Sequence, residues 1–297
     1  SSENKKYFGE FLKLIKTFIG LYKSNRFNED KFEELIDEVE KDENVFMKER
    51  GKLLLEIIKP IYEYYQCYLN KNKKIDFNDM INLATDAIES NRVKRKYRYI
   101  IIDEYQDISV GRFNLVKALQ NQTGAIVVAV GDDWQSIYRF AGSDINLFTL
   151  FPKYFGHTEI LKIENTYRNS QELIDIAGKF VMKNDGQIIK NLKSKKHHSN
   201  PIRILGYDKD ATTALRNALD EIINLNGDKK NILILGRNNF DINFLESDEL
   251  FTIKAKEGGK KVAIIYKKHP KVEIDFITVH KSKGLEFPVV FVAGLDK

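Results

Sequence analysis

The sequence is poor in the features that mark secreted, metal-binding and membrane proteins. Its 297 residues contain one cysteine, Cys67, which excludes an internal disulfide framework and suits a reducing compartment. No apolar run approaches membrane-spanning length and no signal peptide opens the chain, so we expect a cytoplasmic protein without a membrane partner. The five histidines show no metal-ligand spacing.

Proline is also scarce, with five residues, and low-complexity tracts are missing, so the composition gives no sign of disorder. Hydrophobic residues make up 42% of the chain, enough for a large core and two or three domains. The net charge of +5 and the pI near 8.9 are mildly basic. That balance is compatible with a nucleic-acid partner, but the base composition of the genome explains the lysine excess equally well.

Two apolar runs, residues 97–102 and 125–130, each end in acidic residues. The first continues as Asp-Glu-Tyr-Gln-Asp (103–107), and the second as Gly-Asp-Asp-Trp-Gln-Ser-Ile-Tyr-Arg-Phe (131–140). Short β-branched runs are typical of parallel strands buried on both faces of an α/β sheet. Ligands bind beyond the carboxyl ends of such strands, so we predict a nucleotide site at these acids.

The acids suit this chemistry. An aspartate at a strand end, here Asp103, can hold Mg²⁺ through water beside the phosphates of a nucleotide, and the following Glu104 can orient or deprotonate an attacking water. The alternative is that Asp103 and Asp107 only cap the next helix, which is a common use of aspartate.

Taken together, residues 103–107 and 131–140 resemble motifs II and III of superfamily 1 DNA helicases of the UvrD/Rep type, and the Asp-Asp-Trp-Gln form is most similar to the DNA helicase IV branch. Residues 75–81 resemble the segment that closes the helical insertion of these enzymes, residues 164–170 resemble motif IV, and residues 274–287 resemble motif V. The resemblance covers about residues 75–295. It implies an α/β fold with two RecA-like P-loop NTPase lobes, the first incomplete.

The pattern along the chain agrees with this organisation. Apolar residues recur at helical spacing from residue 7 to about residue 90, with a helix start at Asn28 or Asp30. Tyrosines in the third helix, at 53–68, could stack on bases or lie in a helical core. We predict a helical accessory segment at 1–74, part of the first lobe at 75–152, and a C-terminally truncated second lobe at 153–297. The further predicted elements are helices at 145–151, 171–181 and 212–225, strands at 160–163, 202–207, 232–235 and 289–292, and a hairpin of 251–256 with 261–266.

The resemblance also implies roles for individual residues. The catalytic set would be Asp103 as the Mg²⁺ ligand, Glu104 as the group that activates water, Gln135 as the γ-phosphate sensor and Arg168 as an arginine finger. Gly284 and Glu286 would lie near the nucleotide with Arg168. The DNA-facing set would be Tyr138, Arg139, Phe140, Thr278 and His280. The alternatives are a surface salt bridge for Arg168 and an interior position for Tyr138 and Phe140.

The implied function is that of an ATP- and Mg²⁺-dependent DNA helicase that moves 3′ to 5′ on single-stranded DNA and acts at junctions with duplex in repair or recombination. A Gly-x-x-x-x-Gly-Lys-Ser/Thr loop does not occur in the sequence, and motif VI is not found. We therefore expect an internal piece of such an enzyme that hydrolyses no ATP by itself. Two alternatives remain open, a helicase-like factor bound to RNA polymerase and the helicase part of a helicase–nuclease.

Overall fold

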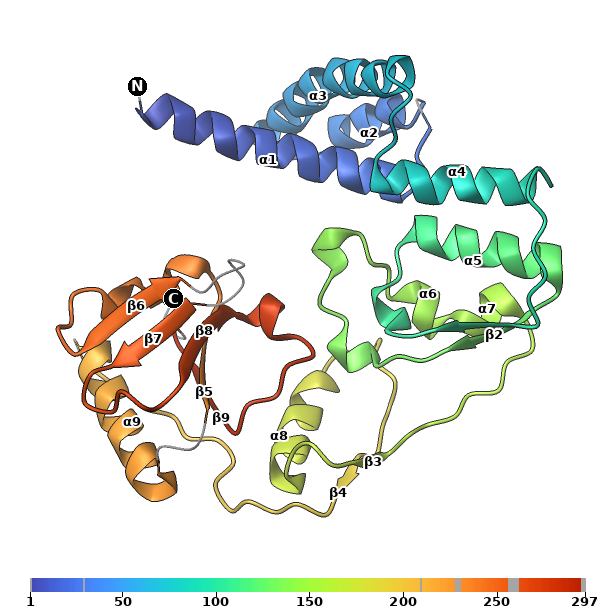
Figure 1. The fold of residues 1–297 in the computed structure, drawn as a ribbon. Helices are drawn as coiled ribbons and strands as arrows, with labels where there is room; N and C mark the ends of the chain where they lie inside the picture. Colours follow the sequence, from blue (N-terminus) through green and yellow to red (C-terminus); the bar gives the residue numbers. More distant parts are fainter. Residues whose placement is uncertain (1, 29, 209, 228–230, 256–261, 295–297) are drawn as a thin grey trace. The chain divides into compact units, whose positions relative to one another are not determined.

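The computed structural model describes residues 2–28, 30–208, 210–227, 231–255 and 262–294 (Figure 1). The chain divides into two compact units, one of residues 1–168 and 174–194, the other of residues 169–173 and 195–297. Each unit contains both helices and parallel strands, so the predicted α/β class is confirmed. The first unit extends beyond residue 152, and the division into three domains stays a prediction.

Three helices open the first unit: α1 (Ser2–Ser24), α2 (Lys31–Glu40) and α3 (Val45–Lys71) (Figure 1). Asp30 is the N-cap residue of α2, one of the two predicted starts. Ile58 and Phe32 are almost fully buried in the core between these helices, and burying side chains of this size contributes about 1.5–3 kcal/mol each. Tyr62 lies in the same core, whereas Tyr64 is 75% exposed. The alternative of a core position therefore holds for Tyr62 and does not hold for Tyr64.

Helix α4 (Phe77–Glu89) begins in the segment that the sequence marked as the end of the helical insertion. Asp76 and Asp79 form a capping box at its start, and both carboxylates pair at 2.6 Å with the ammonium of Lys23, which is only 3% exposed. Burial would raise the pKa of Asp76, but the Lys23 ammonium and the backbone N–H of Asp79 more than offset it, so this pKa lies below its usual value. The motif carboxylates therefore tie α4 to the end of α1.

Strands β1 (Tyr99–Ile102) and β2 (Ile126–Ala129) follow, joined by α5 (Val110–Thr123) (Figure 1). They pair in parallel, with Ile102 opposite Ala129, as the sequence predicted. The prediction of burial on both faces is wrong, because alternate side chains are exposed, including Ile101 at 74%. Among the described residues, the helices pack on the face that contains Ile102 and Ala129, so only that face is covered.

The predicted single helix at 145–151 is also wrong. The structure has two short helices, α6 (Asn146–Thr149) and α7 (Phe151–Phe155), which meet at Leu150. Pro152 lies in the first turn of α7, where its missing N–H costs no helical hydrogen bond. We predicted from the sequence that Pro152 ends a helix, but it lies at the beginning of the next one.

Residues 157–164 and 202–207 form no strand, which corrects the predicted strands at 160–163 and 202–207. Leu161 and Ile204 are 81% and 91% exposed, so within the part of the chain that the structure describes no strand or layer covers these side chains. A two-stranded parallel pair forms instead from β3 (Asn165–Thr166) and β4 (Lys193–Ser194). Between them, α8 (Gln171–Val181) spans the predicted residues.

The second unit contains α9 (Ala211–Asn226) and a five-stranded sheet in the order β6-β7-β8-β5-β9 (Figure 1). Strands β5 (Ile232–Gly236), β8 (Ile274–Thr278) and β9 (Val289–Val292) are parallel. Strands β6 (Phe251–Ala255) and β7 (Val262–Tyr266) form the predicted antiparallel hairpin, whose turn at 257–260 lies outside the described residues. Two short 3₁₀ helices, η4 (Asn239–Leu245) and η5 (Val279–Ser282), complete the unit.

The core of this second unit is made of aliphatic and aromatic side chains and lies between the sheet and α9. Leu219, Leu245, Ile264, Ile274 and Phe276 are each at most 2% exposed. Strand β8 is buried at every residue and β5 at all but one, as is typical of central parallel strands. Among the described residues of both units, no helix is both long enough and apolar enough to cross a membrane.

Candidate functional site

The two acid clusters follow the ends of β1 and β2, which are adjacent parallel strands. The backbone N–H of Val130 donates to Ile102 at 2.8 Å, and the N–H of Tyr105 donates back to Val130 at 2.9 Å. These bonds extend the parallel ladder by one step beyond the last paired residues. The acids after each strand are therefore held at the same edge, the carboxyl edge at which α/β sheets bind ligands.

Asp103 and Glu104 are both exposed at this edge. Glu104 has a left-handed backbone conformation (φ 51°, ψ 39°), which is uncommon for a residue with a side chain and costs about 1 kcal/mol. Its N–H donates to Asp103 Oδ1 at 2.9 Å. The capping alternative does not hold for α5, whose N-cap residue is Ser109 rather than Asp103 or Asp107.

Gln106 joins the first acid cluster to the second. Its side chain is fully buried, its Nε2 donates to Glu104 Oε2 at 2.5 Å, and its Oε1 accepts from the N–H of Asp132 at 3.0 Å. Asp132 Oδ2 in turn accepts from Gln135 Nε2 at 2.7 Å. A continuous series of hydrogen bonds therefore runs from Glu104 to Gln135, the predicted water activator and the predicted phosphate sensor.

Gly131 makes room for this bridge. A Cβ atom at this position would lie within 3.0 Å of Gln106 Oε1 and at 3.0 Å from the ring of Phe148. Real Cβ atoms do not approach other atoms so closely, so any other residue here would have to displace the buried amide from its hydrogen bonds. The glycine that opens the second cluster is thus required by the position of Gln106.

Lys190 is a further partner of the second cluster, which no pattern in the sequence indicated. Its ammonium pairs with both Asp132 and Asp133, although 57 residues or more separate it from them along the chain. Burial would raise the pKa of Asp132, but Lys190 and the amide of Gln135 more than offset it, so this pKa lies below its usual value. Asp132 therefore stays ionised at neutral pH.

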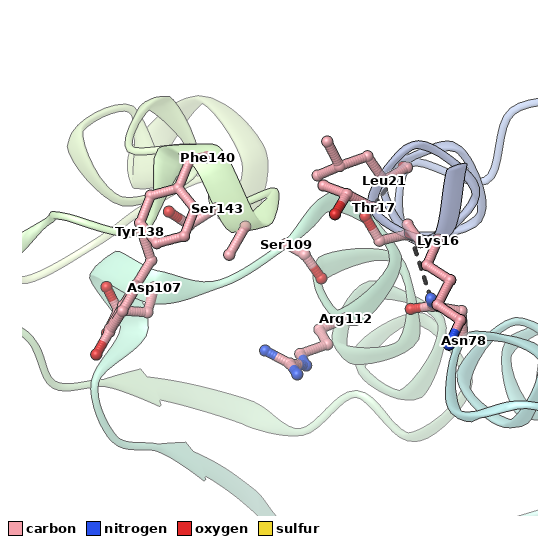
Figure 2. A pocket seen from close by; sticks show the side chains of 13 residues that line it. Lys16, Thr17, Leu21, Asn78, Asp107, Ser109, Arg112, Tyr138, Phe140 and Ser143 are labelled. Carbon is pink, nitrogen blue, oxygen red and sulfur yellow. Dashed lines mark hydrogen bonds between the residues drawn. The ribbon is translucent and has the colours of Figure 1, made fainter. Parts of the chain in front are cut away.

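A pocket of about 490 Å³ lies between the end of α1, the start of α5 and the 3₁₀ helix η3 (Arg139–Ala141). Figure 2 shows Tyr138 and Phe140 on one wall and Thr17 and Leu21 on another, with Arg112 between them. The rings of Tyr138 and Phe140 are 6.1 Å apart and inclined by 59°.

The charges at this pocket are mainly positive. Lys16 and Arg112 contribute cations from exposed positions on α1 and α5, and Asp107 contributes one carboxylate. Asn78 adds an amide, and its Nδ2 donates to the carbonyl of Gly20 at 3.3 Å (Figure 2). Aromatic rings beside cations are the combination that binds single-stranded nucleic acid. The sequence missed Lys16, Asn78 and Arg112, because charged and amide residues on helices carry no distinguishing signal.

Phe140 is 58% exposed, so the alternative of an interior position does not hold for this ring. Tyr138 is half-buried and Arg139 is exposed. Arg168 is exposed, and its backbone N–H donates to Thr166 Oγ1 at 3.5 Å. Their roles toward DNA and nucleotide stay predictions.

The remaining predicted residues lie in the second unit. Thr278 is only 8% exposed, whereas His280 is exposed on η5. Gly284 has φ +80°, as expected of a glycine in a tight turn, and Glu286 is exposed two residues later. Burial of Thr278 leaves little of its side chain for a DNA contact, and the other three are accessible.

The described residues contain no group of three or more histidines, cysteines or acids that could enclose a metal ion. Asp103 is nevertheless suited to Mg²⁺, because this ion keeps most of its waters and needs one or two protein carboxylates. Oδ1 of Asp103 accepts the N–H of Glu104, and the side chain is open to solvent. The predicted role of Asp103 therefore fits the residues present.

Comparison with known proteins agrees with this arrangement. Residues 3–156 match the UvrD/REP helicase N-terminal domain, and residues 248–297 match the UvrD-like helicase C-terminal domain. DNA helicase IV of Escherichia coli (strain K12) is 29% identical over 253 residues, which are 82% of this chain and 33% of that protein. ATP-dependent DNA helicase Rep of Buchnera aphidicola subsp. Acyrthosiphon pisum is 31% identical over 195 residues, or 63% of this chain and 30% of that protein.

A third relative is ATP-dependent DNA helicase PcrA of Bacillus subtilis (strain 168), 32% identical over 152 residues, which are 50% of this chain and 20% of that protein. The chain thus spans about a third or less of the length of these relatives. The N-terminal family model covers more than half of the chain and includes both acid clusters. The prediction from the sequence motifs is confirmed: the chain belongs to the UvrD/Rep helicase family.

Proposed function

We propose that this chain forms part of an ATP-dependent DNA helicase that couples ATP hydrolysis to 3′-to-5′ movement on single-stranded DNA. The observation that carries the proposal is the hydrogen-bonded series from Glu104 through Gln106 and Asp132 to Gln135. Three residues beyond Gln135 the same segment reaches the pocket with Tyr138 and Phe140. One short stretch therefore connects a site suited to nucleotide with a site suited to nucleic acid.

The exposed acids would serve the nucleotide. Asp103 would hold Mg²⁺ through water, and the ion would neutralise charge on the phosphates. Glu104, fixed by its own N–H and by the Gln106 amide, would accept a proton from the attacking water. Arg168 would act as an arginine finger, and Gly284 and Glu286 would lie near the nucleotide, as the family resemblance implies.

The pocket would serve DNA. Phe140 and Tyr138 would stack on bases without regard to sequence, which suits a motor that moves along a strand. Arg139 would approach the same strand, together with Lys16 and Arg112 from the pocket wall, through salt-dependent phosphate contacts. His280 would contact the strand from the second unit, and Thr278 would have to become more exposed to do so.

We infer that residues 75–152 and 153–297 contribute to two RecA-like lobes, preceded by a helical accessory segment at 1–74. The parallel strands of each unit and the two matching family models support this division. Junctions of single- and double-stranded DNA in repair or recombination are the substrates that we propose for the complete protein. The 297-residue chain should release no phosphate from ATP, and DNA-stimulated turnover by the chain would contradict this.

The catalytic half of the proposal is tested in the complete protein encoded by the gene for this chain. Glu104→Gln should retain binding of Mg²⁺-ATP and reduce DNA-stimulated phosphate release by several orders of magnitude, because it removes only the proton acceptor. Glu159→Gln, at another exposed glutamate, is the matched control and should behave as wild type. Turnover of Glu104→Gln within about tenfold of wild type would show that Glu104 is not the activating group.

The DNA half is tested with Phe140→Ala. Stacking of one base on an aromatic ring contributes about 1–3 kcal/mol to binding. Removing the ring should therefore lower the affinity for single-stranded DNA about 5- to 150-fold. Phe46→Ala, at an equally large exposed ring on α3, is the control. Equal affinities for the two variants would exclude the stacking role of Phe140.

A further inference from the structure

The segment that follows α8 folds back over the second acid cluster. Asp133, whose side chain is fully buried, pairs with the Lys190 ammonium and accepts the N–H of Ile188 at 2.7 Å. The amide of Gln187, oriented with its nitrogen toward the carboxylate, donates to the same Oδ2 at 2.6 Å. Three polar interactions, from residues 187, 188 and 190, thus compensate one buried charge, as burial of a carboxylate requires.

The same segment holds the neighbouring tryptophan. Trp134 Nε1 donates to the carbonyl of Ile188 at 3.2 Å, and the Lys190 ammonium lies 5.2 Å from the centre of the Trp134 ring. A cation at this distance from an indole face is attracted to it. The 3₁₀ turn η2 (Asp133–Gln135) is therefore clasped by a segment more than 50 residues away in sequence.

Lys190 also reaches the residue that holds Gln135. Asp132 accepts from Lys190 on Oδ1 and from Gln135 Nε2 on Oδ2. One carboxylate is thus shared between a cation on the returning segment and the amide of the predicted phosphate sensor. If the Lys190 ammonium were removed, Asp132 Oδ1 would keep only the N–H of Trp134 at 3.2 Å, so the carboxylate would be held less firmly and would orient Gln135 less well.

We propose that Lys190 is a positioning residue, which fixes Asp132 and Asp133 so that Gln135 is oriented for the nucleotide. This inference rests on the proposed ATPase function for its consequence, but the clasp itself can be tested without that function. If Lys190 formed only a structural ion pair, its removal would lower the stability of the fold, and any effect on ATP hydrolysis would not depend on whether Gln135 is present. The proposal requires that Lys190 act through Gln135.

The first experiment uses fluorescence of the 297-residue chain, in which Trp134 is the single tryptophan. Lys190→Met should shift the emission to longer wavelength and increase quenching by acrylamide, because the clasp on the indole is released. Lys190→Arg, which can still reach both carboxylates, should restore the wild-type spectrum. Lys183→Met, at an exposed lysine on the same segment, is the control.

An unchanged spectrum and unchanged quenching in a folded Lys190→Met variant would overturn the proposal. Far-ultraviolet circular dichroism establishes whether the variant is folded. If it is not, Lys190→Gln removes the charge while leaving a hydrogen-bond donor for Asp133, and a folded Lys190→Gln variant is held to the same criterion.

The second experiment measures DNA-stimulated ATPase in the complete protein. Lys190→Met should reduce kcat on the order of 10²-fold, as misplacement of a catalytic group by about 1 Å does, with little change in KM for ATP. In a Gln135→Ala background, Lys190→Met should cause no further loss, since the residue through which it acts is gone. Independent, multiplying losses would overturn the positioning role.

The two experiments separate the two hypotheses. A complete protein without DNA-stimulated ATPase would overturn the proposed function, and the fluorescence comparison would still decide whether Lys190 clasps the turn. A normal ATPase in Lys190→Met would overturn the positioning role and leave the proposed function intact.

Discussion

Replacing Gln106 by glutamate is the most exacting test of the link between the acid clusters. The side chain keeps its length, and one carboxylate oxygen can still accept the N–H of Asp132 at 3.0 Å. The other oxygen would face Glu104 Oε2 at 2.5 Å, where wild type has an N–H donor. Two ionised oxygens cannot share that distance in a fully buried position, so the new carboxyl must bind a proton.

The cost follows from this proton. Keeping a glutamic acid protonated at pH 7, against an ordinary pKa of about 4.3, requires roughly 4 kcal/mol, and at pH 5 the requirement falls to about 1 kcal/mol. The pKa of the new carboxyl is raised in the folded state. Its destabilising effect is therefore absent below pH 4 and grows as the pH rises above the unfolded value.

The assay is urea unfolding at pH 5, 6 and 7, followed by the emission of Trp134, which reports on the first unit alone. Gln106→Met is the uncharged control. It leaves the N–H of Asp132 without its acceptor at a cost of about 1–3 kcal/mol, and this deficit should not change with pH. If both variants show the same deficit at every pH, Gln106 is not a buried donor to Glu104 and the reasoning fails.

Three further predictions concern neighbouring positions. Gly131→Ala should displace the Gln106 amide and lower the free energy of unfolding by about 1–3 kcal/mol, measured in the same assay, and an unchanged value would contradict the close approach. Tyr105→Phe should raise that free energy by about 1 kcal/mol, because the buried hydroxyl of Tyr105 has no hydrogen-bond partner among the described residues; a loss of stability would contradict this. Lys23→Met should cost about 2 kcal/mol at pH 7, less than for a fully buried pair because both carboxylates keep partial exposure. The pKa of Asp76 is lowered in the folded state, so this cost should shrink below about pH 4 as Asp76 takes up a proton. An acid titration of Tm in wild type and variant checks the last point, and parallel curves would refute it.

The sequence predicted well what depends on local pattern. The parallel pair of β1 and β2, helices α8 and α9 and the hairpin of β6 with β7 all follow from periodicity and turn residues. The acids were placed correctly at the strand ends, because the carboxyl edge of a parallel strand is determined by chain direction alone.

The failures share a different cause. The apolar run at 160–163 and that at 202–207 have the composition of strands, but a strand forms only where a neighbour supplies hydrogen bonds, and composition does not reveal the neighbour. The exposed face of β1 is a similar case, since its alternation of burial depends on which helices cover it. Lys190 was missed because its two partners are separated from it by nearly 60 residues.

The backbone of Glu104 shows why a buried amide, and not another side chain, connects the two clusters. A non-glycine residue in the left-handed region persists only where its surroundings fix it, and here Asp103 accepts its N–H while Gln106 holds its carboxylate. The residue at position 106 must donate to that carboxylate and accept from Asp132 at once, and among uncharged side chains of this length only glutamine has a separate donor and acceptor at its end. A lysine could donate but not accept, and a glutamate could accept but not donate unless protonated. The strained position of Glu104 and the orientation of Gln135 therefore depend on the same amide group, so a change at Gln106 should alter both together.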